Sequence, residues 1–166
     1  MTTLAQYESY LADAGFTTQF VGADQGLGID QVAVALEPDH AGRERVLWLA
    51  VFTGLEADLA HGHSMMQFAV VLPFALAAET TPAVQQYVLA LNNVLPLIGF
   101  NVHPDPQQII FRYVLMLGPD PSINGRLLRE TIDLISFLLD EFSVPLEALT
   151  LGRISLDEAL DALQGG

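Results

Sequence analysis

The spacing between hydrophobic residues changes several times along the chain, and each spacing indicates one kind of secondary structure. Apolar residues recur every three or four positions, as on helices, at 3–14, 80–98, about 122–142 and about 154–164. They alternate or run together, as in strands, at 16–24, 31–37, 45–54, 67–74, 99–103 and 108–117. Because polar turns separate consecutive strands, we expect an α+β domain spanning 1–166, with an antiparallel sheet of five to six strands.

Capping residues indicate where the second helix begins and ends. Thr80 or Thr81 suits its N-cap, because Pro82 then lies in the first turn, where a missing N–H is tolerated. Pro96 should end regular helix within a residue or two. Its expected buried stripe comprises Val84, Tyr87, Val88, Leu91, Leu95 and Ile98.

The two last helices also have sequence signals. The third helix should begin between 122 and 126 and end near Phe142. Its expected buried stripe comprises Leu128, Ile132, Ile135, Leu138, Leu139 and Phe142. Ser155 and Glu158 form the Ser-x-x-Glu pattern of a capping box, which predicts a short C-terminal helix. The expected order is thus α-β-β-β-(β)-α-β-β-α plus this short helix, the strand at 67–74 being the one in parentheses.

The strand at 108–117 is apolar on both faces, as are those at 45–53 and 67–74. One face carries Ile109, Phe111, Tyr113, Leu115 and Leu117, and helices of the same chain should cover it. The other face carries Ile110, Arg112, Val114 and Met116. Either the helices divide between the two faces or a second copy or partner covers the remainder; we expect a homodimer. Arg112 should reach the sheet edge or pair with an acid, because burying it unpaired is costly.

Charge excludes several classes of partner. The 166 residues include 20 acids against six arginines and no lysine, which leaves a net charge of −14. This balance argues against binding nucleic acids or anionic membranes, which depends on basic residues. The absence of cysteine excludes disulfides and thiol nucleophiles. The first residues contain no cationic leader, and the near-apolar run at 68–78 is too short to span a bilayer, so we expect a cytoplasmic protein.

Residues that could perform chemistry are few. His61 and His63 could bind a metal together with Glu56 or Asp58, but their number and spacing match no established ligand pattern. The glycines of 22–30 resemble a phosphate loop, yet a strand follows them where that loop requires a helix. No G-x-S-x-G motif is present. We therefore expect no catalysis, no metal and no cofactor.

Two groups of residues are candidates for binding a partner or a second subunit. Arg126 and Arg129 lie near the N-terminus of the third helix, the reverse of the order that its dipole favours. They either meet acids on a partner or are ordinary surface charges paired with Glu130 and Asp133. Met65, Met66, Met116 and Trp48 either fill the core or form an adaptable surface. The expected partner or dimer surface comprises Trp48, Ile110, Arg112, Val114, Met116, Arg126 and Arg129.

The stretch "LALNNVLPLIGFNVHPDPQQIIFRYVLML" (89–117) resembles the C-terminal half of YbjN-like proteins, described as bacterial sensory-transduction regulators. The likeness covers about 87–142 and depends on apolar spacing, on Asn92 or Asn93, and on Gly99. It implies the α-β-β-β-α-β-β-α fold of class I type III secretion chaperones, which are usually dimers that bind an extended client. It implies no catalytic residue. A fourth strand before the second helix and the added C-terminal helix depart from that pattern.

Three functions are consistent with these features. The first is a non-enzymatic, homodimeric protein- or peptide-binding module that acts as a chaperone or regulator. The second is a small-molecule sensor or enzyme with a pocket between the second helix and the sheet, using His61 and His63. The third is a dimer whose apolar surface serves self-association alone.

Overall fold

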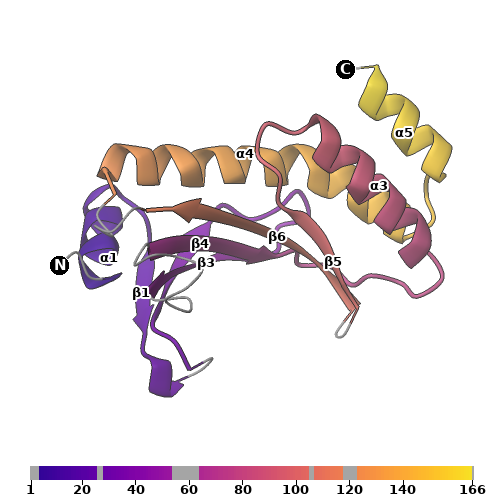
Figure 1. Ribbon diagram of the computed structural model, residues 1–166. Helices are drawn as coiled ribbons and strands as arrows, with labels where there is room; N and C mark the ends of the chain where they lie inside the picture. The colour runs from indigo at the N-terminus through magenta and orange to yellow at the C-terminus, as the bar shows by residue number, and fades with distance from the viewer. Residues whose placement is uncertain (1–3, 26–27, 54–63, 105–106, 118–122, 166) are drawn as a thin grey trace.

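A computed structural model describes residues 4–25, 28–53, 64–104, 107–117 and 123–165. It shows the expected α+β fold, with four α-helices and a six-stranded sheet in this part of the chain (Figure 1). The helices are α1 (Leu4–Asp13), α3 (Thr81–Val94), α4 (Gly125–Thr150) and α5 (Leu156–Gln164). The strands are β1 (Thr18–Val21), β2 (Gln31–Leu36), β3 (Arg45–Thr53), β4 (Ser64–Val71), β5 (Phe100–Pro104) and β6 (Gln107–Met116), and a 3₁₀ turn, η1 (Ala23–Gln25), follows β1.

The sheet is antiparallel throughout, with strand order β1-β2-β3-β4-β6-β5. The first four strands are neighbours in chain order, as short connections favour. After β4 the chain forms α3 and returns at the far edge as β5, and β6 then fills the position between β5 and β4. The predicted additional strand before the second helix is therefore confirmed.

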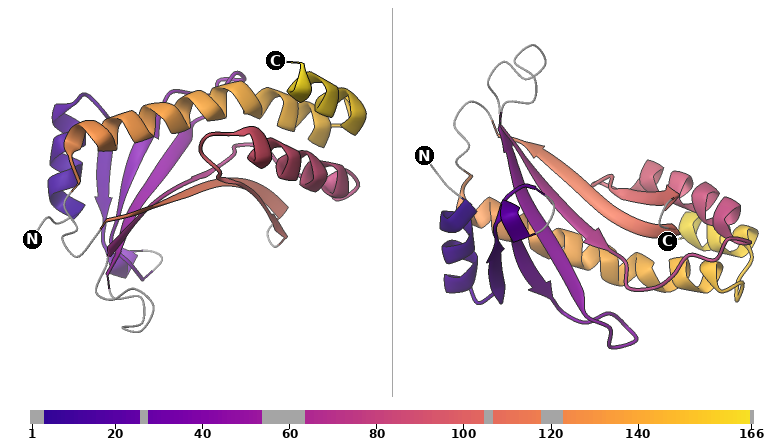
Figure 2. Two further views of the ribbon diagram at one scale, coloured as in Figure 1. Left: turned by 45° about the horizontal axis from the view of Figure 1, so that its top comes forward. Right: turned by 90° about the horizontal axis from the view of Figure 1, so that it is seen from below.

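The α-helices all lie on one face of the sheet. In Figure 1, α4 runs along the sheet, with α1 at one of its ends and α3 and α5 at the other. Seen from below, in the right view of Figure 2, no α-helix covers the strands. The core lies between α4 and the covered face, and its largest fully buried side chains include Leu47, Leu49, Met66, Phe68, Ile109, Phe111, Leu128, Ile132 and Ile135.

The predicted positions of both helix caps are confirmed, although the Thr80 side chain makes no capping hydrogen bond at α3. Thr80 is the N-cap of α3, and Pro82 lies in the first turn of that helix. The Thr80 hydroxyl donates to the carbonyl of Thr150 at 2.8 Å and so joins the start of α3 to the end of α4. At α5, Ser155 and Glu158 form the complete capping box. These local signals placed the starts of α3 and α5.

Helix α4 continues beyond the end expected near Phe142 to Thr150, although Pro145 lies inside it. A proline removes one helical hydrogen bond, yet Leu146 and Leu149 beyond it are 0% and 2% exposed. Burial of this last stretch therefore outweighs the local cost of the proline. Phe142, expected in the core, is only half-buried.

Helix α3 ends at Val94, two residues before Pro96, as predicted. Ile98, expected in the buried stripe, lies past the helix and is 65% exposed. Two strand boundaries were wrong. Strand β4 begins at Ser64 instead of 67, because Ser64 still pairs with Thr53 across the sheet. The first strand is shorter than the expected 16–24, since the chain turns into η1 where pairing with β2 stops.

Candidate partner-binding surface

On the uncovered face of the sheet, alternate residues of the adjacent strands β3, β4 and β6 lie side by side. Register places Arg112 opposite Ala69, and Ala69 opposite Trp48. The residues on this face of β3, β4 and β6, here named the open face, are Val46, Trp48, Ala50, Phe52, Met65, Gln67, Ala69, Val71, Ile110, Arg112, Val114 and Met116.

The open face is apolar and accessible in the monomer. Met116 is 68% exposed and Val71 is 43% exposed, while Trp48 and Ile110 are half-buried. These side chains are contiguous, because they come from adjacent strands in register. A contiguous apolar surface of this kind is typical of a site where another molecule binds.

The charge of the open face differs from that of the whole chain. The six strands contain no Asp or Glu, although the chain has 20 acids. Arg112 is the one charged side chain on the open face, and its Nε donates to Gln67 Oε1 at 2.6 Å. It is exposed and bonded to a neutral partner, so its remaining N–H groups can donate to an acceptor on a bound molecule.

Five of the seven residues predicted to bind a partner lie together on the open face: Trp48, Ile110, Arg112, Val114 and Met116. Arg126 and Arg129 do not join them, because they lie on α4, which packs on the opposite face of the sheet. Their Nε atoms face Glu130 Oε1 at 2.7 Å and Asp133 Oδ2 at 3.6 Å, as the helical spacing allows. Met66 faces the core, whereas Met65 and Met116 are cross-strand partners on the open face.

The expected histidine site falls on residues that the structure does not describe. His61, His63, Glu56 and Asp58 all belong to 54–63, outside the described ranges. Among the residues that are described, no three His, Asp or Glu side chains come together in a way that could hold a metal ion.

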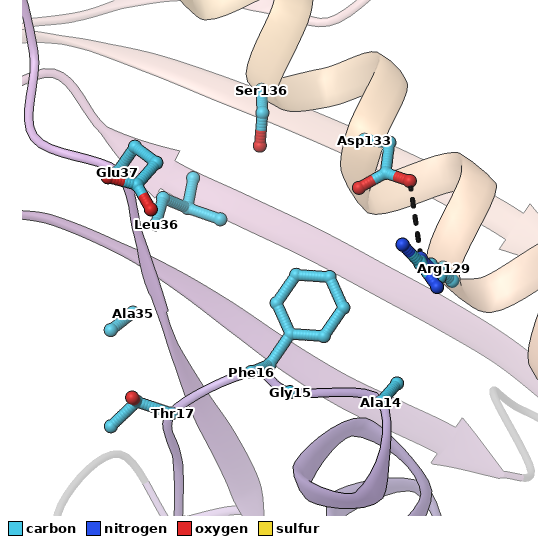
Figure 3. Close-up of a pocket in the computed structure, with 10 residues that line it drawn as sticks. All are labelled: Ala14, Gly15, Phe16, Thr17, Ala35, Leu36, Glu37, Arg129, Asp133 and Ser136. Atoms are coloured by element: carbon cyan, nitrogen blue, oxygen red, sulfur yellow. Dashed lines mark ion pairs between the residues drawn. The ribbon is translucent and has the colours of Figure 1, made fainter.

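Two hollows on the helical side are open to solvent and not enclosed. The hollow in Figure 3 measures about 440 Å³ and lies between α4 and the chain around Phe16. Its charged residues on α4, Arg129 and Asp133, are paired with each other. Between α3 and β5 a shallower hollow of about 250 Å³ is lined mainly by apolar side chains and the amides of Gln85, Asn92 and Asn101. Neither has the enclosed form of a typical ligand site.

A partly buried ionic network joins the β2–β3 turn to the second half of α4. Arg43 donates from Nη1 and Nη2 to the two carboxylate oxygens of Glu147, at 2.7 Å each, and from Nε to Asp39 Oδ2 at 2.7 Å. His40 Nε2 lies 2.9 Å from Glu147 Oε2. The sequence suggested only a polar turn here. The i,i+4 spacing of Asp39 and Arg43 was a signal that these two side chains could pair. No feature of the sequence indicated that Glu147 on α4 joins them.

The network shifts the pKa values of its acids. The hydrogen bonds from Arg43 hold the pKa of Glu147 below its ordinary value of 4.5, against the opposing effect of burial. Burial raises the pKa of Asp39, but hydrogen bonds from Arg43 and from the Ala41 N–H outweigh it, so the net shift is downward. Both carboxylates therefore stabilise the fold in their charged form.

Glu147→Gln is expected to lower the free energy of unfolding by about 1–3 kcal/mol at pH 7. The difference from wild type should shrink as the pH falls. Because the folded pKa of Glu147 lies below 4.5, its contribution is complete above about pH 4.5 and is lost as the pH falls through the folded pKa. Urea unfolding at pH 7 and pH 3 measures both values.

The matched control is Glu130→Gln, which removes an exposed acid paired with Arg126 on the same helix. Exposed pairs contribute little, so this variant should stay within about 0.5 kcal/mol of wild type at both pH values. A Glu147→Gln effect that is the same at pH 7 and pH 3 would contradict the assigned pKa shift.

Comparison with models of known protein families finds no match for this chain, and comparison with curated protein sequences finds none either. The resemblance to YbjN-like proteins therefore stays a prediction from residues 87–142. In the part of the chain that the structure describes, no helix combines the length and the apolar character needed to cross a bilayer. The surface itself remains the most direct indication of function.

Proposed function

We propose that this protein is a non-enzymatic homodimer that binds a protein or peptide partner on the open face of its sheet. The observation that carries the proposal is an uncovered, contiguous apolar sheet face without a single acid, in a chain of net charge −14. Burying apolar surface contributes about 25 cal/mol per Å², so such a face favours association. A chaperone-like or regulatory role in the cytoplasm agrees with this surface.

The shape and charge of the open face favour a polypeptide over a small molecule. The face is a sheet surface, not an enclosed cavity, and it offers one strong donor, Arg112, among apolar side chains. A partner with apolar side chains and one acceptor for Arg112 would match it. The acids elsewhere on the surface would disfavour acidic partners and attract basic flanking segments.

Arg112→Glu is expected to reduce partner binding at least about tenfold, because it places an unpaired acid in the apolar surface. The test immobilises wild type and the variant and compares, by quantitative mass spectrometry, the proteins that each retains from extract of the native cell. A partner that wild type retains saturably and the variant loses supports the proposal.

Arg153→Glu is the matched control, because it reverses the same charge at an exposed position after α4, away from the open face. It should retain the same proteins as wild type. Equal retention by all three proteins, or no saturable partner for wild type, would contradict binding at the open face. Thermal melting of each variant verifies that it is folded.

A further inference from the structure

The solvent side of α4 carries an apolar stripe of its own. Its members are 38–58% exposed although they are large and hydrophobic; they are Leu127, Leu134, Phe137 and Val144 on the helix and Leu151 at its C-cap, here named the α4 stripe. Their side of the helix is distinct from the buried side that packs on the sheet. In the left view of Figure 2, α4 lies in front of the strands, and α5 lies against its C-terminal end.

The α4 stripe has the spacing of a helix-pairing seam. Leu127 and Leu134 are seven residues apart, and so are Phe137, Val144 and Leu151 in turn. The step from Leu134 to Phe137 is three residues, so the two series occupy the a and d positions of a heptad pattern. This spacing keeps apolar side chains on one side of a helix where another helix can pack.

The stripe is also nearly symmetric about its own middle. Leu127 and Leu151 lie at equal distances on either side of position 139, and so do Leu134 and Val144. In an antiparallel pair of these helices that crosses at position 139, Leu127 of one copy would therefore meet Leu151 of the other. Leu134 would meet Val144 in the same way. A two-fold interface requires this self-complementarity, in which residue i meets j and j meets i. The exception is Phe137, whose counterpart is Glu141.

The acids along one edge of the stripe are paired with arginines of the same chain. Asp133, Asp140 and Glu147 follow one edge of the stripe at seven-residue spacing. Each lies against an arginine of its own chain, as the ion pairs Arg129–Asp133, Arg45–Asp140 and Arg43–Glu147. A second copy can approach this edge without meeting a row of unpaired acids, although the whole chain has a net charge of −14.

We propose that two copies of this chain pair through antiparallel packing of their α4 stripes. The inference deepens the proposed function, because it assigns the dimer contact to α4 and leaves the open face of each sheet free for a partner. Since α4 lies on the covered side of the sheet, pairing through α4 points the two open faces away from each other.

Sedimentation equilibrium at micromolar concentration measures the association of the chain and tests whether the α4 stripe is the dimer contact. Wild type should be a dimer, and Leu134→Asp should weaken its association at least about 100-fold, because two carboxylates enter an apolar contact. The matched control is Leu89→Asp, which changes a leucine on α3 that is 67% exposed and should leave the association unchanged. Glu141→Leu should tighten the dimer about tenfold, because it supplies the missing counterpart of Phe137.

A cross-linking experiment tests the register, since the native chain has no cysteine. In the proposed pair, residue 134 of one copy meets residue 144 of the other, whereas the two residues 134 lie about 15 Å apart along the axis. A mixture of Leu134→Cys and Val144→Cys proteins should form a disulfide dimer, and neither variant alone should, because the bond requires Cα atoms within about 7 Å.

Three outcomes would overturn the inference: a wild-type monomer at these concentrations, a dimer that Leu134→Asp leaves intact, or no disulfide in the mixture. The proposed function fails separately. If Arg112→Glu instead of Leu134→Asp dissociates the dimer, two copies pair through the open face and the α4 contact is wrong. If Leu134→Asp gives a monomer that still retains the partner lost by Arg112→Glu, both the α4 contact and the open-face site are supported.

Discussion

Asn92→Ala is expected to lower the free energy of unfolding by about 2–4 kcal/mol, since each buried polar group left unpaired costs about 1–3 kcal/mol. The Asn92 side chain binds the backbone of Phe100 twice: Nδ2 donates to the Phe100 carbonyl at 2.7 Å, and Oδ1 accepts from the Phe100 N–H at 3.2 Å. Phe100 is 1% exposed, so water cannot easily replace the lost amide. The clamp therefore holds the start of β5 against α3.

The neighbouring Asn93 is the control, because it is exposed on the same helix and has the same side chain. Asn93→Ala should change the free energy of unfolding by no more than about 0.5 kcal/mol, as surface substitutions usually do. Guanidinium unfolding at one fixed protein concentration, followed by the fluorescence of Trp48, the single tryptophan, measures both variants. Equal effects of the two substitutions would show that the clamp does not stabilise the fold.

Gly99→Ala is expected to destabilise the protein by about 1–3 kcal/mol through overpacking. A Cβ at position 99 would lie 2.6 Å from Cζ and 2.7 Å from Cε2 of Phe111. The Phe111 ring is fully buried and packs edge-on against Phe100, with ring centroids 5.0 Å apart, so it has no free space to move into. Glycine at this position lets the chain that enters β5 pass directly over the ring.

Phe111→Leu tests this cause, because a smaller side chain removes the contact with the new methyl group. In the Phe111→Leu background, Gly99→Ala should cost at least about 1 kcal/mol less than it does in wild type, a coupling typical of residues in direct contact. Strictly additive effects in the double-mutant cycle would mean that the overlap with Phe111 is not the source of the destabilisation.

These two predictions give a physical meaning to the stretch that resembles YbjN-like proteins. The resemblance depends on apolar spacing, on Asn92 or Asn93 and on Gly99; of these residues, Asn92 binds the start of β5 and Gly99 lies over the Phe111 ring. They secure the connection from α3 to the sheet and perform no chemistry. The resemblance itself stays a prediction, and the roles of these two residues concern the fold of this chain alone.

Much of the fold could be predicted from local patterns. Thr80 and Ser155 marked helix starts, because capping depends on residues within one turn. The alternation in β6 separated its two faces correctly: Ile109 and Phe111 are buried, and Arg112 and Met116 are exposed. This alternation is set by the geometry of a strand, which no tertiary contact needs to supply.

The candidate surfaces were only partly predictable. Two-sided apolar strands indicated an uncovered face, but the exposed stripe on α4 could not be separated from its buried stripe before the packing was known. Arg126 and Arg129 were placed with the binding surface because the sequence does not show that α4 packs on the opposite face. The pairing of Arg43 with Glu147 joins positions 104 residues apart, and local pattern does not carry such information.

By itself, the sequence determined the kinds of elements, their order, the two faces of each strand and a strongly acidic surface charge. These properties depend on backbone periodicity, capping and composition, which act over a few residues. The tertiary structure alone decided that all α-helices of the described chain gather on one face, that α4 continues past Pro145, and which apolar residues remain exposed. Each of these depends on which distant side chains share a core, and burial there outweighs local preference.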